Sequence, residues 1–181
     1  IFYIIRKLPN FIRLLLVDLY FIIPSKKKNF PNRITIFLTD KCNMKCSHCF
    51  IIKDVPKKTI EISFTEYVKI FKSLKGRTSQ ILLTGGEPTL RTDLYDIAYQ
   101  AYHIGKVSTI SIFSNALYPS KTKALLEEIL KNTNLNINFQ TSLDGLKEFH
   151  NLNRKVKKSY ENVISTIQMI NDLKTVYKNR F

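Results

Sequence analysis

The sequence predicts an α/β fold in which a parallel sheet is built from repeated β–α units. Short apolar, β-branched segments alternate with stretches whose apolar residues recur at helical spacing. Polar and glycine-rich motifs directly follow the expected strands, as they do where the carboxyl ends of parallel strands carry functional residues. Units of this kind are joined by right-handed crossovers, so successive strands are expected side by side.

The first unit is expected to begin with a buried strand over residues 34–38, which is a continuous apolar run. Its helix is expected from Ser63 to Leu74, where apolar residues recur at helical spacing. Glu66 stands three residues after Ser63, a spacing typical of a capping box at a helix start, and Gly76 then ends the helix.

The later units follow the same alternation of apolar strand patterns and amphipathic helix patterns. The expected strands are residues 80–84, 107–113 and 135–143, and the expected helices are 92–104, 120–130 and 159 to about 177. Together with the first unit, this predicts four parallel strands and four helices.

All three cysteines of the chain, Cys42, Cys46 and Cys49, follow the first expected strand with C-x3-C-x2-C spacing. Three thiols in one short loop indicate a metal or iron–sulfur site, because disulfide frameworks use even numbers of cysteines at wider spacing. A cluster held by three thiolates leaves one iron open for chemistry. The alternative is a structural Cys3His zinc site with His48 as the fourth ligand.

Unusual residues also follow the other three expected strands. Gly85 and Gly86 end the second strand before Glu87 and Pro88, and glycines at this place let backbone groups approach a ligand closely. A plain glycine-rich turn is the alternative. Ser114–Asn115 follows the third strand and residues 142–145 end the fourth, so all four motifs are expected at one mouth of the sheet.

The cysteine loop and the Gly-Gly-Glu-Pro motif together resemble the radical S-adenosylmethionine (radical SAM) superfamily. His48 precedes the last cysteine, and the glycine motif begins 36 residues after Cys49. The segment at residues 142–145, followed by His150 and Arg154, resembles the branch with SPASM or twitch C-terminal domains. The resemblance covers about residues 33–172. It implies a partial (β/α)6 TIM-like barrel. This chain is expected to supply about four of the β–α units and to be truncated at its C-terminus.

The resemblance also implies two cofactors, a [4Fe-4S] cluster and S-adenosylmethionine. Cys42, Cys46 and Cys49 would bind three irons, and the amino and carboxylate groups of S-adenosylmethionine would chelate the fourth. His48 would lie near the adenine, and backbone groups of Gly85 and Gly86 would meet the methionine ammonium. The other positions implied to contact the cofactor are Glu87, Ser114, Asn115, Ser142 and Arg154. For Glu87 the alternative is a brace of its own loop, and for Arg154 a solvated arginine.

The implied activity is reductive cleavage of S-adenosylmethionine to a 5′-deoxyadenosyl radical that abstracts hydrogen from an unknown substrate. The implied partners are a one-electron donor such as a ferredoxin or flavodoxin, and a substrate that is a peptide or a small molecule. Ala116 and Lys157–Lys158 depart from the family pattern, which has glycine near these places. No residue is assigned as a substrate base.

Composition adds a net charge of +15 from lysines and arginines spread along the chain. This spread indicates a lysine-rich composition and does not predict nucleic-acid binding. Reduced cysteines predict a cytoplasmic protein. Residues 1–32 are expected as an apolar helix and a basic linker, separate from a core domain over 33–181. No apolar run reaches transmembrane length, so residues 1–23 either pack on a protein surface or make peripheral membrane contact.

Overall fold

The computed structural model describes residues 30–51, 60–178 and 180–181. The chain divides into a unit of residues 1–31 and a unit of residues 32–181, and all the elements below belong to the second unit. The predicted apolar helix and most of the predicted linker, in residues 1–29, lie outside the described residues. The division into domains at residues 32 and 33 therefore stays a prediction.

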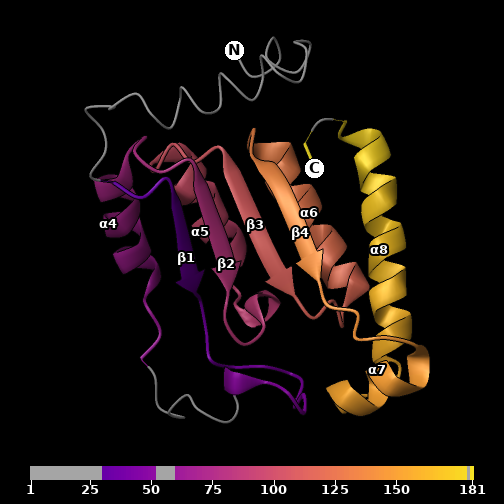
Figure 1. The fold of residues 1–181 in the computed structure, drawn as a ribbon. Helices are drawn as coiled ribbons and strands as arrows, with labels where there is room; N and C mark the ends of the chain where they lie inside the picture. Colours follow the sequence, from indigo (N-terminus) through magenta and orange to yellow (C-terminus); the bar gives the residue numbers. More distant parts are fainter. Residues whose placement is uncertain (1–29, 52–59, 179) are drawn as a thin grey trace, which may run out of the picture. The chain divides into compact units, whose positions relative to one another are not determined.

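The second unit is built on an open sheet of four parallel strands, drawn as arrows in Figure 1. The strands are β1 (Arg33–Phe37), β2 (Gln80–Thr84), β3 (Thr109–Ser114) and β4 (Asn136–Thr141), and their order in the sheet is their order in the chain. The α/β class and the four parallel strands are confirmed. All four carboxyl ends therefore lie at the same edge of the sheet.

Four of the helices form a series beside the sheet: α4 (Phe64–Leu74), α5 (Leu94–His103), α6 (Pro119–Asn132) and α8 (Ser159–Val176). Consecutive members of the series contact each other, and α5 and α6 lie behind the sheet in Figure 1. The core lies between these layers, and many of its apolar side chains are at most 1% exposed. Its members include Phe71, Ile81, Leu83, Ile97, Ile110, Ile112, Leu126, Ile129, Ile137 and Val163.

The start of α4 confirms the predicted capping box. The hydroxyl of Ser63 accepts from the Glu66 backbone N–H at 3.4 Å, and the Ser63 N–H donates to Glu66 Oε2 at 2.8 Å. Two of the backbone donors that a helix start leaves unpaired are satisfied in this way. The cap fixes where the chain turns from the segment after the cysteine loop into the first helix.

Two elements were not predicted from the sequence: the 3-10 helix η1 (Pro88–Leu90) and the helix α7 (Lys147–Arg154). The fourth strand also ends at Thr141, two residues before the predicted end. The helix α7 buries His150 and Arg154 and exposes apolar residues, which is the reverse of the pattern that identifies an amphipathic helix. Among the described helices, none has the length and apolar character needed to cross a bilayer.

Candidate functional site

A cavity of about 270 Å³ lies where the carboxyl ends of the four strands meet the cysteine loop. Ten of the residues predicted for the site line it: Cys42, Cys46, His48, Cys49, Gly85, Gly86, Ser114, Asn115, Ser142 and Arg154. The cavity is also lined by residues that the sequence did not single out: Met44, Phe50, Ile51, Thr84, Phe113 and Gln140. The structure therefore brings together motifs that are more than one hundred residues apart in the chain.

Two side chains from different parts of the chain reach the cysteine sulfurs. Asn115 Nδ2, after β3, lies 3.8 Å from Cys42 Sγ, and Arg154 Nη1, at the end of α7, lies 3.7 Å from Cys46 Sγ. All three cysteines are free thiols of intermediate burial. Such N–H donors favour thiolate over thiol, because hydrogen bonding to the charged form stabilises it.

The environment of Cys42 favours the neutral thiol over the thiolate. Burial raises the pKa of the Cys42 thiol above its ordinary value, and the charges of Glu87 and Cys46 add to the rise. Hydrogen bonds from the Met44 backbone and from Asn115 lower the pKa only in part. A bound cation would favour the thiolate, because its positive charge stabilises the deprotonated form.

Gly85 and Gly86 allow the cysteine loop to lie directly against the loop after β2. A Cβ on Gly86 would overlap the Lys41 carbonyl, and a Cβ on Gly85 would overlap the Thr39 carbonyl. The Gly86 N–H donates to Thr39 O at 2.7 Å, and Gly85 has a φ of +131°. Within the described residues, neither glycine carbonyl accepts a backbone hydrogen bond.

Glu87 does not line the cavity but lies beneath it, with only 1% of its surface exposed. Its Oε1 accepts from the Thr89 N–H at 3.1 Å, the Thr89 hydroxyl at 2.6 Å and the Ser114 hydroxyl at 2.8 Å. Its Oε2 accepts from the Asn115 N–H at 2.7 Å. Both carboxylate oxygens therefore accept hydrogen bonds from protein groups. This placement supports the alternative that Glu87 stabilises the loops around it, rather than a direct contact with the cofactor.

The end of α7 is attached to the cysteine loop by three interactions. The Ser47 N–H donates to Asn153 O at 2.9 Å, Asn153 Nδ2 lies 2.9 Å from Nδ1 of the exposed His48, and Arg154 reaches Cys46. Because an amide nitrogen only donates, Nδ1 of His48 accepts, and the neutral ring then carries its proton on Nε2. Asn153 was not predicted as a site residue; its place next to Arg154 was the only signal.

Asp144 holds Arg154 in place. Arg154 Nε donates to Asp144 Oδ2 at 2.8 Å, Nη2 donates to Oδ1, and Asn153 adds a third donor at 2.7 Å. Burial acts to raise the pKa of Asp144, but these hydrogen bonds and the arginine charge outweigh it, and the net pKa is lowered. The alternative of a solvated Arg154 is wrong, since this side chain is buried and paired.

His150 has a structural place within α7 and does not line the cavity. Its Nδ1 accepts from the Asp144 N–H at 3.2 Å, and its Nε2 therefore carries the proton and donates to the Ser159 hydroxyl at 3.0 Å. The ring is 1% exposed, and burial lowers its pKa. His150 thus connects the turn after β4 with the start of α8.

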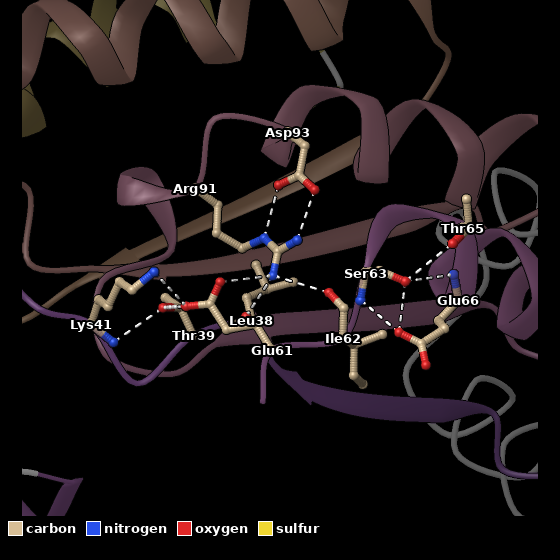
Figure 2. A network of polar contacts seen from close by, with 10 residues as sticks. All are labelled: Leu38, Thr39, Lys41, Glu61, Ile62, Ser63, Thr65, Glu66, Arg91 and Asp93. Carbon is tan, nitrogen blue, oxygen red and sulfur yellow. Dashed lines mark hydrogen bonds and ion pairs between the residues drawn. The ribbon is translucent and has the colours of Figure 1, made fainter. Parts of the chain in front are cut away.

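A second polar network supports the segment before the cysteines (Figure 2). Arg91 pairs with both oxygens of Asp93 at 2.8 and 2.7 Å and donates to the Leu38 carbonyl at 3.0 Å and the Ile62 carbonyl at 3.2 Å. Glu61 accepts from the Thr39 hydroxyl at 2.6 Å. Residues 38–41 are therefore held between this network and the glycine pair.

The residues present fit an iron–sulfur cluster by the chemistry of their donor set. Three soft thiol ligands lie in one loop, with Asn115 and Arg154 as N–H donors to sulfur. The buried Nδ2 of Asn43, beside Cys42, has no hydrogen-bond partner among the described residues, and an inorganic sulfide would supply one. In the described part of the chain, no three His, Cys, Asp or Glu side chains form a preformed metal site, so the fit rests on donor chemistry.

A model of the Radical SAM superfamily matches residues 36–178, and the chain belongs to this family. A GTP 3′,8-cyclase of Clostridium botulinum is 30% identical over 145 residues, which cover 74% of this chain and 44% of that protein. The molybdenum cofactor biosynthesis protein 1 of Drosophila melanogaster is 32% identical over 141 residues, 75% of this chain and 24% of that protein. The chain thus spans less than half the length of these relatives.

Solved structures share the fold. The Streptococcus suis protein SuiB bound to S-adenosylmethionine has a TM-score of 0.64 at 20% identity, over 80% of this chain and 32% of that chain. The structure of anSMEcpe with bound AdoMet has a TM-score of 0.63 at 18% identity, over 78% of this chain and 40% of that chain. These likenesses confirm the predicted partial-barrel class, here as an open sheet.

Proposed function

We propose that this chain is the cluster- and S-adenosylmethionine-binding part of a radical SAM enzyme. The observation that carries the proposal is the cavity in which the cysteine loop meets the motifs after β2, β3 and β4. Membership of the family supports it. When bound, the cluster and S-adenosylmethionine supply one-electron cleavage of a carbon–sulfur bond and a carbon radical that abstracts hydrogen from a substrate.

The protein residues of this site would bind and orient the cofactors. Cys42, Cys46 and Cys49 would hold three irons, and Asn115 and Arg154 would donate to their sulfurs. The carbonyls of Gly85 and Gly86, which accept no backbone hydrogen bond within the described residues, would accept from the methionine ammonium. Ser142, exposed at the end of β4, and His48 at the rim would contact the nucleoside part of S-adenosylmethionine.

Glu87 and Asp144 act in this proposal as positioning residues. Glu87 fixes Ser114 and Asn115 relative to the glycine pair through its buried hydrogen bonds. Asp144 orients the guanidinium of Arg154 towards Cys46. Both roles pre-organise donors around the reacting group, which reduces the reorganisation needed when it binds.

The partners and the compartment belong to the same proposal. A ferredoxin or flavodoxin in the cytoplasm would supply the electron. The substrate would be a peptide or a small molecule, and relatives of both kinds exist, since SuiB is solved with the precursor peptide SuiA and the cyclases are named for GTP. The cavity side chains do not favour one substrate class over the other.

Anaerobic reconstitution with iron and sulfide tests cluster binding. The wild-type chain should retain about four irons and four sulfides per molecule after desalting, with brown colour. Cys46→Ala should lose most of both, while Ser47→Ala, on an exposed neighbour in the same loop, should retain them. Retention of a single zinc without sulfide in the wild type would instead support the Cys3His alternative.

A further inference from the structure

Helix α7 presents its apolar residues outward. Leu146, Phe149 and Leu152 are 78%, 59% and 76% exposed. They are spaced three residues apart, with Leu146 at the N-cap and the other two within the helix. The polar residues His150 and Arg154 are buried on the opposite side. We call the surface formed by Leu146, Phe149 and Leu152 the α7 face. A row of exposed apolar side chains of this kind is a mark of an interaction surface.

The α7 face adjoins the cysteine loop without lining the cavity. Asn153, next to Leu152, contacts Ser47 and His48, and Arg154 reaches the sulfur of Cys46. Leu146, Phe149 and Leu152 are absent from the lining of the cavity. A partner on this face would therefore lie close to the cysteine loop but outside the space in which a substrate would react.

Exposed lysines lie at the end of α7 and in the cysteine loop that α7 contacts. Lys45 in the cysteine loop and Lys155 at the end of α7 are exposed, and neither forms an ion pair within the described residues. Lys147 is paired with Glu161 at 2.6 Å, and Glu148 is the one acidic residue of the helix itself. An apolar centre with cationic residues nearby fits a partner with the opposite pattern, an apolar centre within an acidic surface.

We propose that the α7 face, with Lys45 and Lys155, docks an acidic one-electron carrier protein. This inference rests on the proposed function, which requires that a single electron reach the cysteine-bound cluster from outside. The carrier is oxidised by one electron, the cluster is reduced by one electron, and no bond or proton is exchanged in the step. A small surface suffices, because electron-transfer complexes are transient and bury less than about 1,200 Å².

A carrier fits the face better than a peptide substrate does. A substrate must place a hydrogen inside the cavity, whereas the residues of the α7 face point away from it. A carrier needs only proximity to the cysteine loop, which α7 contacts directly. The overall charge of +15 would further speed the encounter with an acidic protein.

The test compares a flavodoxin with dithionite as electron source for the reconstituted full chain. The apolar variant Phe149→Ser/Leu152→Ser and the charge variant Lys155→Glu, which lies outside the cysteine loop, should each weaken binding of oxidised flavodoxin about tenfold at low salt. Cluster reduction by reduced flavodoxin should slow to the same degree. Reduction by dithionite should not change, since it needs no docking surface.

Matched controls lie at the far end of α8, away from α7 in Figure 1. Val176→Ser removes an apolar side chain that is 72% exposed, and Lys174→Glu reverses an exposed charge. Both should bind flavodoxin as the wild type does. Unchanged flavodoxin binding in the α7 variants, or an equal loss with dithionite, would overturn the inference. If the wild type fails to hold a cluster at all, the proposed function fails instead.

Discussion

The close contact between the glycine pair and the cysteine loop defines the site at the scale of single residues. The Thr39 and Lys41 carbonyls occupy the space where Cβ atoms of Gly85 and Gly86 would lie. Each carbonyl also accepts a hydrogen bond from the glycine loop, at 2.7 Å from Gly86 and 2.8 Å from Glu87. The glycines thus set the distance between the loop that would hold the cluster and the loop that would hold the cofactor.

Gly86→Ala should destabilise the protein by about 3 kcal/mol, because the new methyl group overlaps backbone that is not free to move. The control is Gly76→Ala. Gly76 has a φ of +74°, but a Cβ added to it would have no neighbouring atom within 4 Å. This substitution should cost only about 1 kcal/mol from left-handed strain. Chemical denaturation measures both, and equal costs would contradict close packing as the role of Gly86.

The buried carboxylate of Glu87 can be tested without changing its shape. In Glu87→Gln, an amide N–H₂ faces N–H and O–H groups that now donate to a carboxylate oxygen. Because one of these donors then loses its acceptor, the free energy of unfolding should fall by about 2 kcal/mol. Glu127→Gln on the surface of α6, where the carboxylate makes only exposed ion pairs, should change stability by less than about 0.5 kcal/mol. Thermal unfolding measures the stability of both variants. Equal losses of stability would contradict a structural role for the buried Glu87 carboxylate.

Sequence reasoning identified which residues gather at the site but not how each is used. The cysteine spacing, the glycine motif, the predicted strand ends and the family resemblance together named ten residues that line one cavity. The glycines were interpreted as room for a ligand, but their Cβ positions are filled by backbone of a segment more than forty residues away. The role of Asp144 was not predicted, because its pairing with Arg154 is recognisable only in three dimensions.

At the scale of elements, α7 is the least predictable part of the fold and the one that completes the site. Sequence patterns assign apolar residues to buried faces, and α7 reverses that rule by burying His150 and Arg154. The four β–α units, in contrast, follow the rule, and their strands and helices agree with the prediction to within a few residues. The polar inner face of α7 is what connects the turn after β4 to the cysteine loop.

The attachment of α7 should depend on pH through His150. Its folded pKa is lowered by burial, so its contribution to stability is complete above the unfolded pKa of about 6.5 and is lost as the pH falls through the folded value. The free energy of unfolding should therefore decrease from pH 7 to pH 5.5. His150→Asn keeps an acceptor near Nδ1 and should flatten this decrease; an unchanged slope would contradict the assignment.

The start of α8 contains a strained lysine. Lys158 is exposed and has a φ of +63°, in the left-handed region that glycine occupies without cost. Lys158→Gly should therefore stabilise the protein by up to about 1 kcal/mol. Lys157→Gly, at an exposed neighbour without a positive φ, should be neutral or destabilising. Glycine is also the residue that the family pattern has near this position. A lower melting temperature for Lys158→Gly would contradict the prediction that Lys158 strains the backbone.

At the scale of the whole molecule, the order of the strands explains why one edge of the sheet carries the chemistry. Four parallel strands in sequential order place four loops at the same edge, and each loop contributes residues to one cavity. Residues 38–41 connect this edge to both polar networks, one beneath the cavity through Glu87 and one outside it through Arg91. Both networks therefore hold the segment that leads into the cysteine loop.

Formation of 5′-deoxyadenosine tests the central claim most directly. The anaerobically reconstituted chain is incubated with S-adenosylmethionine and dithionite, and the product is quantified by mass spectrometry. We predict 5′-deoxyadenosine and methionine from the wild type, and neither above background from Cys46→Ala. A wild-type chain that holds an intact cluster but yields no 5′-deoxyadenosine would contradict the account.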